Sequence, residues 1–274
     1  MGKPDIRMAV AAGYFYPASP GELNRQIRSF IPDQVHSKHT ALACLLPHAG
    51  YTYSGNVAVK TLSRINIREK IILIGPNHTG RGLPFSIMAE GLWQTPLGEV
   101  EIDSALAKEI LSGCRYLKTD KAAHADEHSL EVELPLLQYF RKDFTIVPIS
   151  VMHQQADILK EIGKDIAAAI KRRKEENSVL IIASSDLTHY EPQVAAEKKD
   201  DAVIGAILKL DADKLMERVL GLNISMCGLA PAVIMLSAAL ELGASRAELV
   251  KYQTSGDVTK DKDSVVGYAG ITIN

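Results

Sequence analysis

Polar side chains of the metal-binding and acid–base types follow several apolar, strand-like runs of this sequence. His48 follows ALACLLP, His78 follows KIILIGP, and Asp186 and His189 follow SVLIIASS. Cys227 stands in SMCGLAP, at the expected start of a long helix. Two imidazoles with a thiolate or a carboxylate suit Fe(II), Zn(II) or Cu, so these residues predict a metal site.

These residues should meet if their strands run parallel, because ligands bind outside the carboxyl ends of the strands in open α/β sheets. Two imidazoles with a thiolate or a carboxylate would then be metal ligands, and His189 would serve as an acid/base oriented by Asp186. Each residue also has a structural alternative. A histidine beside a strand can be a hydrogen-bonded core residue, Asp186 can cap a turn, and Cys227 can be a small buried hydrophobe. Histidines after three strands of one chain favour the metal site.

A second polar cluster lies in AHADEHSLEVELP. It contains two histidines and four acids: His124, Asp126, Glu127, His128, Glu131 and Glu133. One interpretation is a helix start with Asp126 or Ser129 as cap, Glu127 and Glu131 on one helix face, and surface charge around them. The other interpretation has Glu127 or His128 reaching the metal pocket behind the ligands. The cluster is not the HExxH zinc motif.

The fold class follows from strand-like runs that alternate with helical patterns. The strand-like runs are continuous rather than alternating, which predicts strands buried on both faces of a sheet; they are ALACLLP, KIILIGP, FTIVPISV, SVLIIASS, ELVKYQT and VVGYAGITI. Helical patterns stand between them, as in QADILKEIGKDIAAAIKRRKEEN, while residues 80–103 suggest hairpins. We therefore predict an α/β protein with a layered sheet flanked by helices, in a single domain over residues 1–274.

Composition excludes several classes of function. The chain has 274 residues, 31 Lys and Arg, 33 Asp and Glu, and a net charge of −2, which gives no basic footprint for nucleic acid. The apolar stretch at 227–243 contains Pro231 and Glu241 and predicts a buried helix rather than a membrane span. Three widely spaced cysteines favour a reducing cytoplasm. Neither a P-loop, a GxGxxG fingerprint nor a GxSxG elbow is present.

Eight motifs occur in an order that resembles the Memo family, which is named for a mediator of ErbB2-driven cell motility. They are AGYFYP, PHAGYTYSG, GPNHTG, TPLGEVEID, DEHSLEVELP, SSDLTHY, CGLAP and YQTSGDV, and they cover nearly the whole chain. The resemblance implies a fold like that of the class III extradiol dioxygenases (LigB-like). It implies metal ligands at His48, His78 and Cys227, and pocket residues at Asp186 and His189. It also implies the prokaryotic AmmeMemoRadiSam gene association, with a radical SAM protein as partner system.

Three functions are consistent with these residues. The first is redox or oxygen-related metal chemistry, as in a dioxygenase-like oxidoreductase, on a small molecule or peptide in the pocket. Iron is the favoured metal, with copper or zinc as alternatives. The second is a non-catalytic metal- or peptide-binding adaptor. The third is a zinc hydrolase, in which Asp186 or His189 would activate water. A cysteine where extradiol dioxygenases have a glutamate argues against ordinary ring cleavage.

Overall fold

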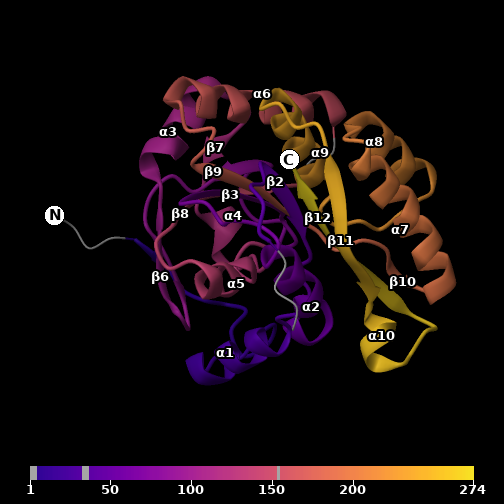
Figure 1. The fold of residues 1–274 in the computed structure, drawn as a ribbon. Coiled ribbons are helices and arrows are strands. Elements are labelled where there is room, and N and C mark those ends of the chain that lie inside the picture. Colours follow the sequence, from indigo (N-terminus) through magenta and orange to yellow (C-terminus); the bar gives the residue numbers. More distant parts are fainter. Residues whose placement is uncertain (1–4, 33–36, 153–154) are drawn as a thin grey trace.

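A mixed sheet of twelve strands forms the centre of the molecule (Figure 1). The coordinates are those of a computed structural model, which describes residues 5–32, 37–152 and 155–274. The main path of the sheet runs β1-β5-β6-β8-β3-β9-β2-β12-β10, with β11 paired to β12, and β4 to β7 and β8. The strands are β1 (Ile6–Arg7), β2 (Ala43–Leu46), β3 (Lys70–Pro76), β4 (Phe85–Ile87), β5 (Leu92–Thr95), β6 (Gly98–Ile102), β7 (Lys118–Thr119), β8 (Thr145–Val151), β9 (Val179–Ser184), β10 (His189–Glu191), β11 (Ala247–Thr254) and β12 (Val265–Ile273).

The four strands that position the candidate site are parallel. β3 pairs with β8 on one side and β9 on the other, and β9 pairs with β2. Their side chains are almost entirely buried, as expected for parallel strands that helices cover on both faces. The α/β class and the helix-flanked, layered sheet are therefore confirmed, and residues 80–103 form β4 and the β5–β6 hairpin as expected.

Helices cover both faces of these strands. The helices are α1 (Pro20–Ser29), α2 (Tyr51–Leu62), α3 (Ser104–Gly113), α4 (Ala122–Ala125), α5 (Glu133–Phe140), α6 (Ala156–Arg173), α7 (Gln193–Leu208), α8 (Ala212–Gly221), α9 (Leu229–Glu241) and α10 (Ser255–Thr259). Figure 1 shows α6 and α9 on one side of the central strands, and α1 and α2 on the other.

Alternate residues of each central strand enter two separate cores. Ile72 and Ile74 pack in the core that contains α6 and α9, whereas Ile71 and Leu73 pack in the core that contains α1, α2 and α5. This follows from the two-residue period of a strand. Burying each such side chain contributes about 1.5–3 kcal/mol of transfer free energy. Gly163 allows α6 to approach α9, since a Cβ there would lie 2.5 Å from the carbonyl oxygen of Ile234.

Two expectations about elements are corrected. The helix expected from Ser129 begins only at Glu133, because residues 129–132 form turns. The cap of this helix is Val132 rather than Asp126 or Ser129. β11 is not buried on both faces, because it lies outside the main path and pairs only with β12, so most of its residues are half-buried. The apolar stretch near residue 230 forms the buried helix α9, and none of the helices in the described residues is long and apolar enough to cross a membrane.

Candidate metal centre

The sheet brings the sequence-predicted ligands together at the carboxyl ends of its parallel strands. His48 lies two residues after β2, His78 two residues after β3, and Asp186 two residues after β9. Cys227 lies just before α9, whose first cap residue is Gly228. The expected convergence of these four residues at one sheet edge is present, because the three strands are parallel and adjacent.

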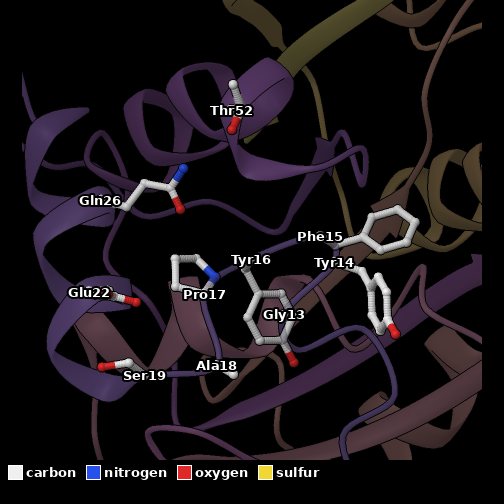
Figure 2. Close-up of a pocket in the computed structure, with 10 residues that line it drawn as sticks. All are labelled: Gly13, Tyr14, Phe15, Tyr16, Pro17, Ala18, Ser19, Glu22, Gln26 and Thr52. Atoms are coloured by element: carbon white, nitrogen blue, oxygen red, sulfur yellow. The ribbon is translucent and has the colours of Figure 1, made fainter.

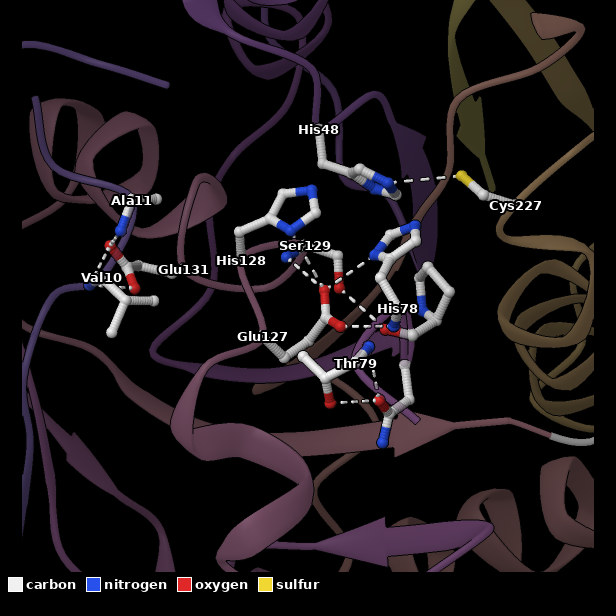
Figure 3. Close-up of polar contacts among 12 residues, drawn as sticks. Val10, Ala11, His48, His78, Thr79, Glu127, His128, Ser129, Glu131 and Cys227 are labelled. Carbon is white, nitrogen blue, oxygen red and sulfur yellow. Dashed lines mark hydrogen bonds and ion pairs between the residues drawn. The ribbon is translucent and has the colours of Figure 1, made fainter. Parts of the chain in front are cut away.

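His48 is held at both ring nitrogens. Its Nδ1 lies 2.8 Å from the hydroxyl oxygen of Ser184. Its Nε2 lies 3.3 Å from Sγ of Cys227, as Figure 3 shows. Its backbone N–H donates to Oδ1 of Asp186 at 2.9 Å. The side chain is buried, and burial lowers the pKa of His48 well below its ordinary value. The ring is therefore neutral, which is the form that binds metals.

His78 is held by a buried carboxylate. Glu127 accepts from the His78 backbone N–H at 2.5 Å and lies 2.9 Å from His78 Nδ1. Burial alone would raise the pKa of Glu127, but the hydrogen bond and charge of His78, with the N–H of Ser129, lower it to about 2. An ionised carboxylate on Nδ1 leaves Nε2 as the free donor atom of His78, an arrangement common behind metal-bound histidines.

Cys227 completes this group and is half-buried. Its Sγ accepts from the backbone N–H of Asp186 at 3.2 Å. Burial, and then the charge of Asp186, raise the pKa of the Cys227 thiol. Burial also raises the pKa of Asp186 to about 7, against the opposing hydrogen bonds from the N–H groups of His48 and Ala49.

The donor atoms fit a metal ion. One ligand atom from each of His48, His78 and Cys227 lies within 4.8 Å of the other two. A tetrahedral zinc site would separate a nitrogen and a sulfur ligand by about 3.5 Å, and His48 Nε2 and Cys227 Sγ are 3.3 Å apart. Two imidazoles and one sulfur form a ligand set that suits zinc, copper or iron. The residues present therefore fit the metal that the sequence predicts.

His128 borders the same centre. Its ring stacks on His78 at a centroid distance of 4.8 Å and lies tilted against the Phe15 ring at 4.3 Å. Its Nδ1 lies 3.5 Å from Oε1 of Glu127, so His78, Glu127 and His128 form a second group with metal-ligand spacing. Glu127 thus stands directly behind His78, whereas His128 flanks it.

His189 is oriented differently from the sequence expectation. Its Nδ1 lies 2.7 Å from the carbonyl oxygen of Leu187, and its backbone N–H donates to Ser225 at 2.7 Å. The Leu187 carbonyl therefore fixes the ring where we expected Asp186 to do so, because Asp186 is turned toward the backbone of His48. Burial lowers the pKa of His189, and the nearby charge of His78 lowers it further.

Three of the four acids of the second polar cluster are not surface charges, whereas Asp126 is exposed and pairs with Arg81. Glu127, Glu131 and Glu133 are all buried. Glu131 accepts from the N–H groups of Val10 and Ala11 and from the hydroxyl of Tyr16, and pairs with Arg7. The surface-charge interpretation is therefore wrong for Glu127, Glu131 and Glu133. The helix face expected to be shared by Glu127 and Glu131 is also wrong, because the chain turns here before α5 begins.

Sequence reasoning missed three residues that support the centre. Ser184 contacts His48, Glu133 contacts Ser184, and the guanidinium of Arg7 donates to the backbone carbonyl of Glu127 at 2.6 Å. Ser184 and Glu133 lie inside two of the quoted motifs. In LEVELPLL the other six residues besides Glu131 and Glu133 are apolar, and this is the signal that could have identified Glu133 as buried.

A cavity of about 610 Å³ lies beside the centre, on the side of the N-terminal segment. Figure 2 shows its lining: Gly13, Tyr14, Phe15, Tyr16, Pro17, Ala18, Ser19, Glu22, Gln26 and Thr52. Phe15 lines this cavity, and its ring also contacts that of His128. The Phe15–His128 contact therefore links the cavity lining to the candidate metal centre.

This chain is similar to known proteins along almost its whole length. A family model described as "Memo-like protein" matches residues 7–272. A MEMO1 family protein of Aquifex aeolicus is 42% identical over 267 residues, covering 97% of this chain and 98% of the relative. A MEMO1 family protein of Methanocaldococcus jannaschii is 41% identical over 286 residues, covering 98% and 99%. The crystal structure of an uncharacterized protein from Escherichia coli K12 is similar in fold, with a TM-score of 0.58 and 16% identity over 85% of this chain and 99% of that one.

Proposed function

This chain belongs to the Memo-like protein family, and from that premise we propose that it binds a metal ion at His48, His78 and Cys227 for redox or oxygen-related chemistry. The observation that carries the proposal is the approach of three ligand atoms, all within 4.8 Å, from three distant segments of the chain. Iron is the first choice of metal, and copper or zinc are the alternatives. A bound iron or copper ion would supply electron transfer or oxygen binding, and zinc would supply Lewis acidity.

The surrounding residues have roles that follow from their contacts. Glu127 fixes the His78 ring through Nδ1, and Asp186 fixes the backbone at His48. His189 donates its Nδ1 proton to the Leu187 carbonyl, so its Nε2 lone pair is available to take a proton from a bound molecule. We propose that His189 acts as the acid/base. We propose Asp186 as a second residue of the same pocket. A small molecule or a peptide is the proposed occupant.

A zinc hydrolase is the second candidate, because histidines and cysteine are also the donors of catalytic zinc sites. Metal analysis separates the two. Protein prepared without oxygen would be measured for iron, copper and zinc, and then assayed for oxygen consumption and for ester or phosphate hydrolysis. Iron or copper with oxygen consumption supports the first function, and zinc with hydrolysis supports the second. Metal without turnover supports a non-catalytic adaptor.

The site assignment is tested by single substitutions of the three ligands. His48→Ala, His78→Ala and Cys227→Ala should each lose most of the bound metal. Cys114→Ala is the matched control, because Cys114 is a buried free thiol outside the group of ligand atoms. If all three ligand variants keep the metal content of the unsubstituted protein, the proposed site is wrong.

Two further parts of the proposal concern the cell. We propose a reducing cytoplasm as the compartment, because the three free thiols, including the metal-binding Cys227, must stay reduced. We also propose a radical SAM protein as the partner system, which co-purification of the two proteins would test.

A further inference from the structure

The hydroxyl of Ser184 lies among three buried polar atoms. Its Oγ is 2.8 Å from Nδ1 of His48, 2.9 Å from the carbonyl oxygen of Ser129, and 3.0 Å from Oε1 of Glu133. All four residues are buried. These polar atoms must therefore form their hydrogen bonds with one another inside the protein.

Proton counting resolves how these contacts are made. A serine hydroxyl has one hydrogen to donate and two lone pairs to accept with. The buried Ser129 carbonyl can only accept, and the Ser184 hydroxyl donates to it at 2.9 Å, so we assign the single Ser184 hydrogen to this bond. The two remaining neighbours must then donate to Ser184: His48 through an Nδ1–H, and Glu133 through a protonated carboxyl.

The other polar atom of each side chain, Oε2 of Glu133 and Nε2 of His48, is consistent with this assignment. Burial raises the pKa of Glu133 well above its ordinary value, which favours the protonated acid, and Oε2 of Glu133 has no hydrogen-bond partner among the described residues. Leaving a neutral carboxyl oxygen unpaired costs much less than leaving a charged one. On His48, a proton at Nδ1 leaves Nε2 as a lone pair facing the Cys227 thiol.

We propose that Ser184, oriented by the Ser129 carbonyl and by a protonated Glu133, is the positioning residue that fixes His48 as its Nδ1–H tautomer. This tautomer directs the Nε2 lone pair at the place where the metal would bind. The two histidine ligands are thus held differently, since His78 is backed by the carboxylate of Glu127 and His48 by a neutral hydroxyl. The effect of Ser184 on metal affinity rests on the proposed function, whereas the assignment of the His48 tautomer does not.

The tautomer is measured on the metal-free protein by nitrogen-15 NMR of its imidazole rings. We expect His48 to carry its proton on Nδ1 in the unsubstituted protein, and Ser184→Ala to populate both tautomers. Ser150→Ala is the matched control, because Ser150 is also a buried serine of a central strand, and its hydroxyl has no partner among the described residues. A proton on Nε2 in the unsubstituted protein, which needs no variant to detect, overturns the proposal. So does an unchanged tautomer in Ser184→Ala.

The protonation of Glu133 is tested by infrared spectroscopy at mildly alkaline pH. The band of a protonated carboxyl should disappear in Glu133→Gln, whose amide can still donate to Ser184. If the difference spectrum contains only a carboxylate band, the proton assignment is wrong.

The effect on metal binding is measured by titration with Co(II). Replacing a residue behind a metal-bound histidine weakens metal affinity by about 10- to 100-fold, and we expect a loss in this range for Ser184→Ala but none for Ser150→Ala. The Co(II) affinity of Glu133→Gln should stay close to that of the unsubstituted protein. An Nδ1–H tautomer in a protein that binds no Co(II) contradicts the proposed function and supports the present inference. Unchanged Co(II) affinity in Ser184→Ala contradicts the positioning role alone.

Discussion

Arg7 and Glu131 form a buried ion pair that joins the first strand to the loop carrying Glu127 and His128. Their side chains are only 5% and 0% exposed. Arg7 also lies over the Trp93 ring at 4.3 Å and donates to the backbone of Glu127. The N-terminal segment is therefore part of the scaffold of the candidate metal centre.

Removing one partner of this pair should be strongly destabilising. Arg7→Met leaves the Glu131 carboxylate buried without its cation, and we expect a loss of about 3–5 kcal/mol in the free energy of unfolding. Denaturant unfolding measures it. Arg81→Met is the control, since the Arg81–Asp126 pair is exposed and should contribute no more than about 1 kcal/mol. Equal losses in the two variants would contradict the prediction.

The carboxylate behind His78 should strengthen metal binding. Glu127→Gln keeps the shape of the side chain but removes its charge, so we expect about 10- to 100-fold weaker metal affinity. Isothermal titration with Zn(II) or Co(II) gives this number. Glu99→Gln, at an exposed glutamate, serves as the control. An affinity unaffected by Glu127→Gln would show that the charge of Glu127 does not act on the metal.

The sulfur of Cys227 should be visible in the spectrum of a cobalt-loaded protein. We expect an intense sulfur-to-cobalt charge-transfer absorption that is lost in Cys227→Ser and kept in Cys114→Ser. Co(II) affinity should fall by at least about tenfold in Cys227→Ser. Persistence of the band in that variant would assign the sulfur ligand to another residue.

Stability should fall in mild acid because of His124. Burial, and then the charge of Arg7, lower the pKa of His124 to about 4, against the weaker opposing charges of Asp120 and Glu127. Its ordinary pKa is about 6.5, so the unfolded chain binds the proton more tightly. The contribution of neutral His124 to the free energy of unfolding is fully present above about pH 6.5. It is lost as the pH falls to about 4, which lowers the free energy of unfolding by about 3 kcal/mol.

Replacing this histidine removes the titrating group. The free energy of unfolding of His124→Phe should fall less steeply than that of the unsubstituted protein across this pH range. Parallel stability curves for the two proteins would rule out His124 as the cause.

The positions of the candidate ligands at the strand ends were predictable, because an apolar run and a following polar residue occur together in the sequence at each of them. Runs of Val, Ile and Leu identify β2, β3 and β9, and the polar residues that follow them must share an edge once those strands are parallel. Motif order along the chain then identified the family, as the relatives confirm.

The supporting contacts were not predictable because they depend on tertiary packing. Glu127 and Glu131 have the i, i+4 spacing of one helix face, but the chain turns before α5, and both side chains are buried. Arg7 stands 120 residues from the Glu127 carbonyl it contacts, and no local pattern encodes that pairing. The orientation of His189 likewise depends on a backbone carbonyl, which every residue possesses.

The distance along the chain between His48 and Cys227 also sets when the centre can form. These two residues are 179 positions apart, and the sulfur stands at the start of α9. During synthesis, a ribosome-bound chain carries both histidines long before it carries the thiol. Because contacts between such distant residues form late in folding, a metal at the proposed site would gain its sulfur ligand only after the chain has been synthesised as far as α9.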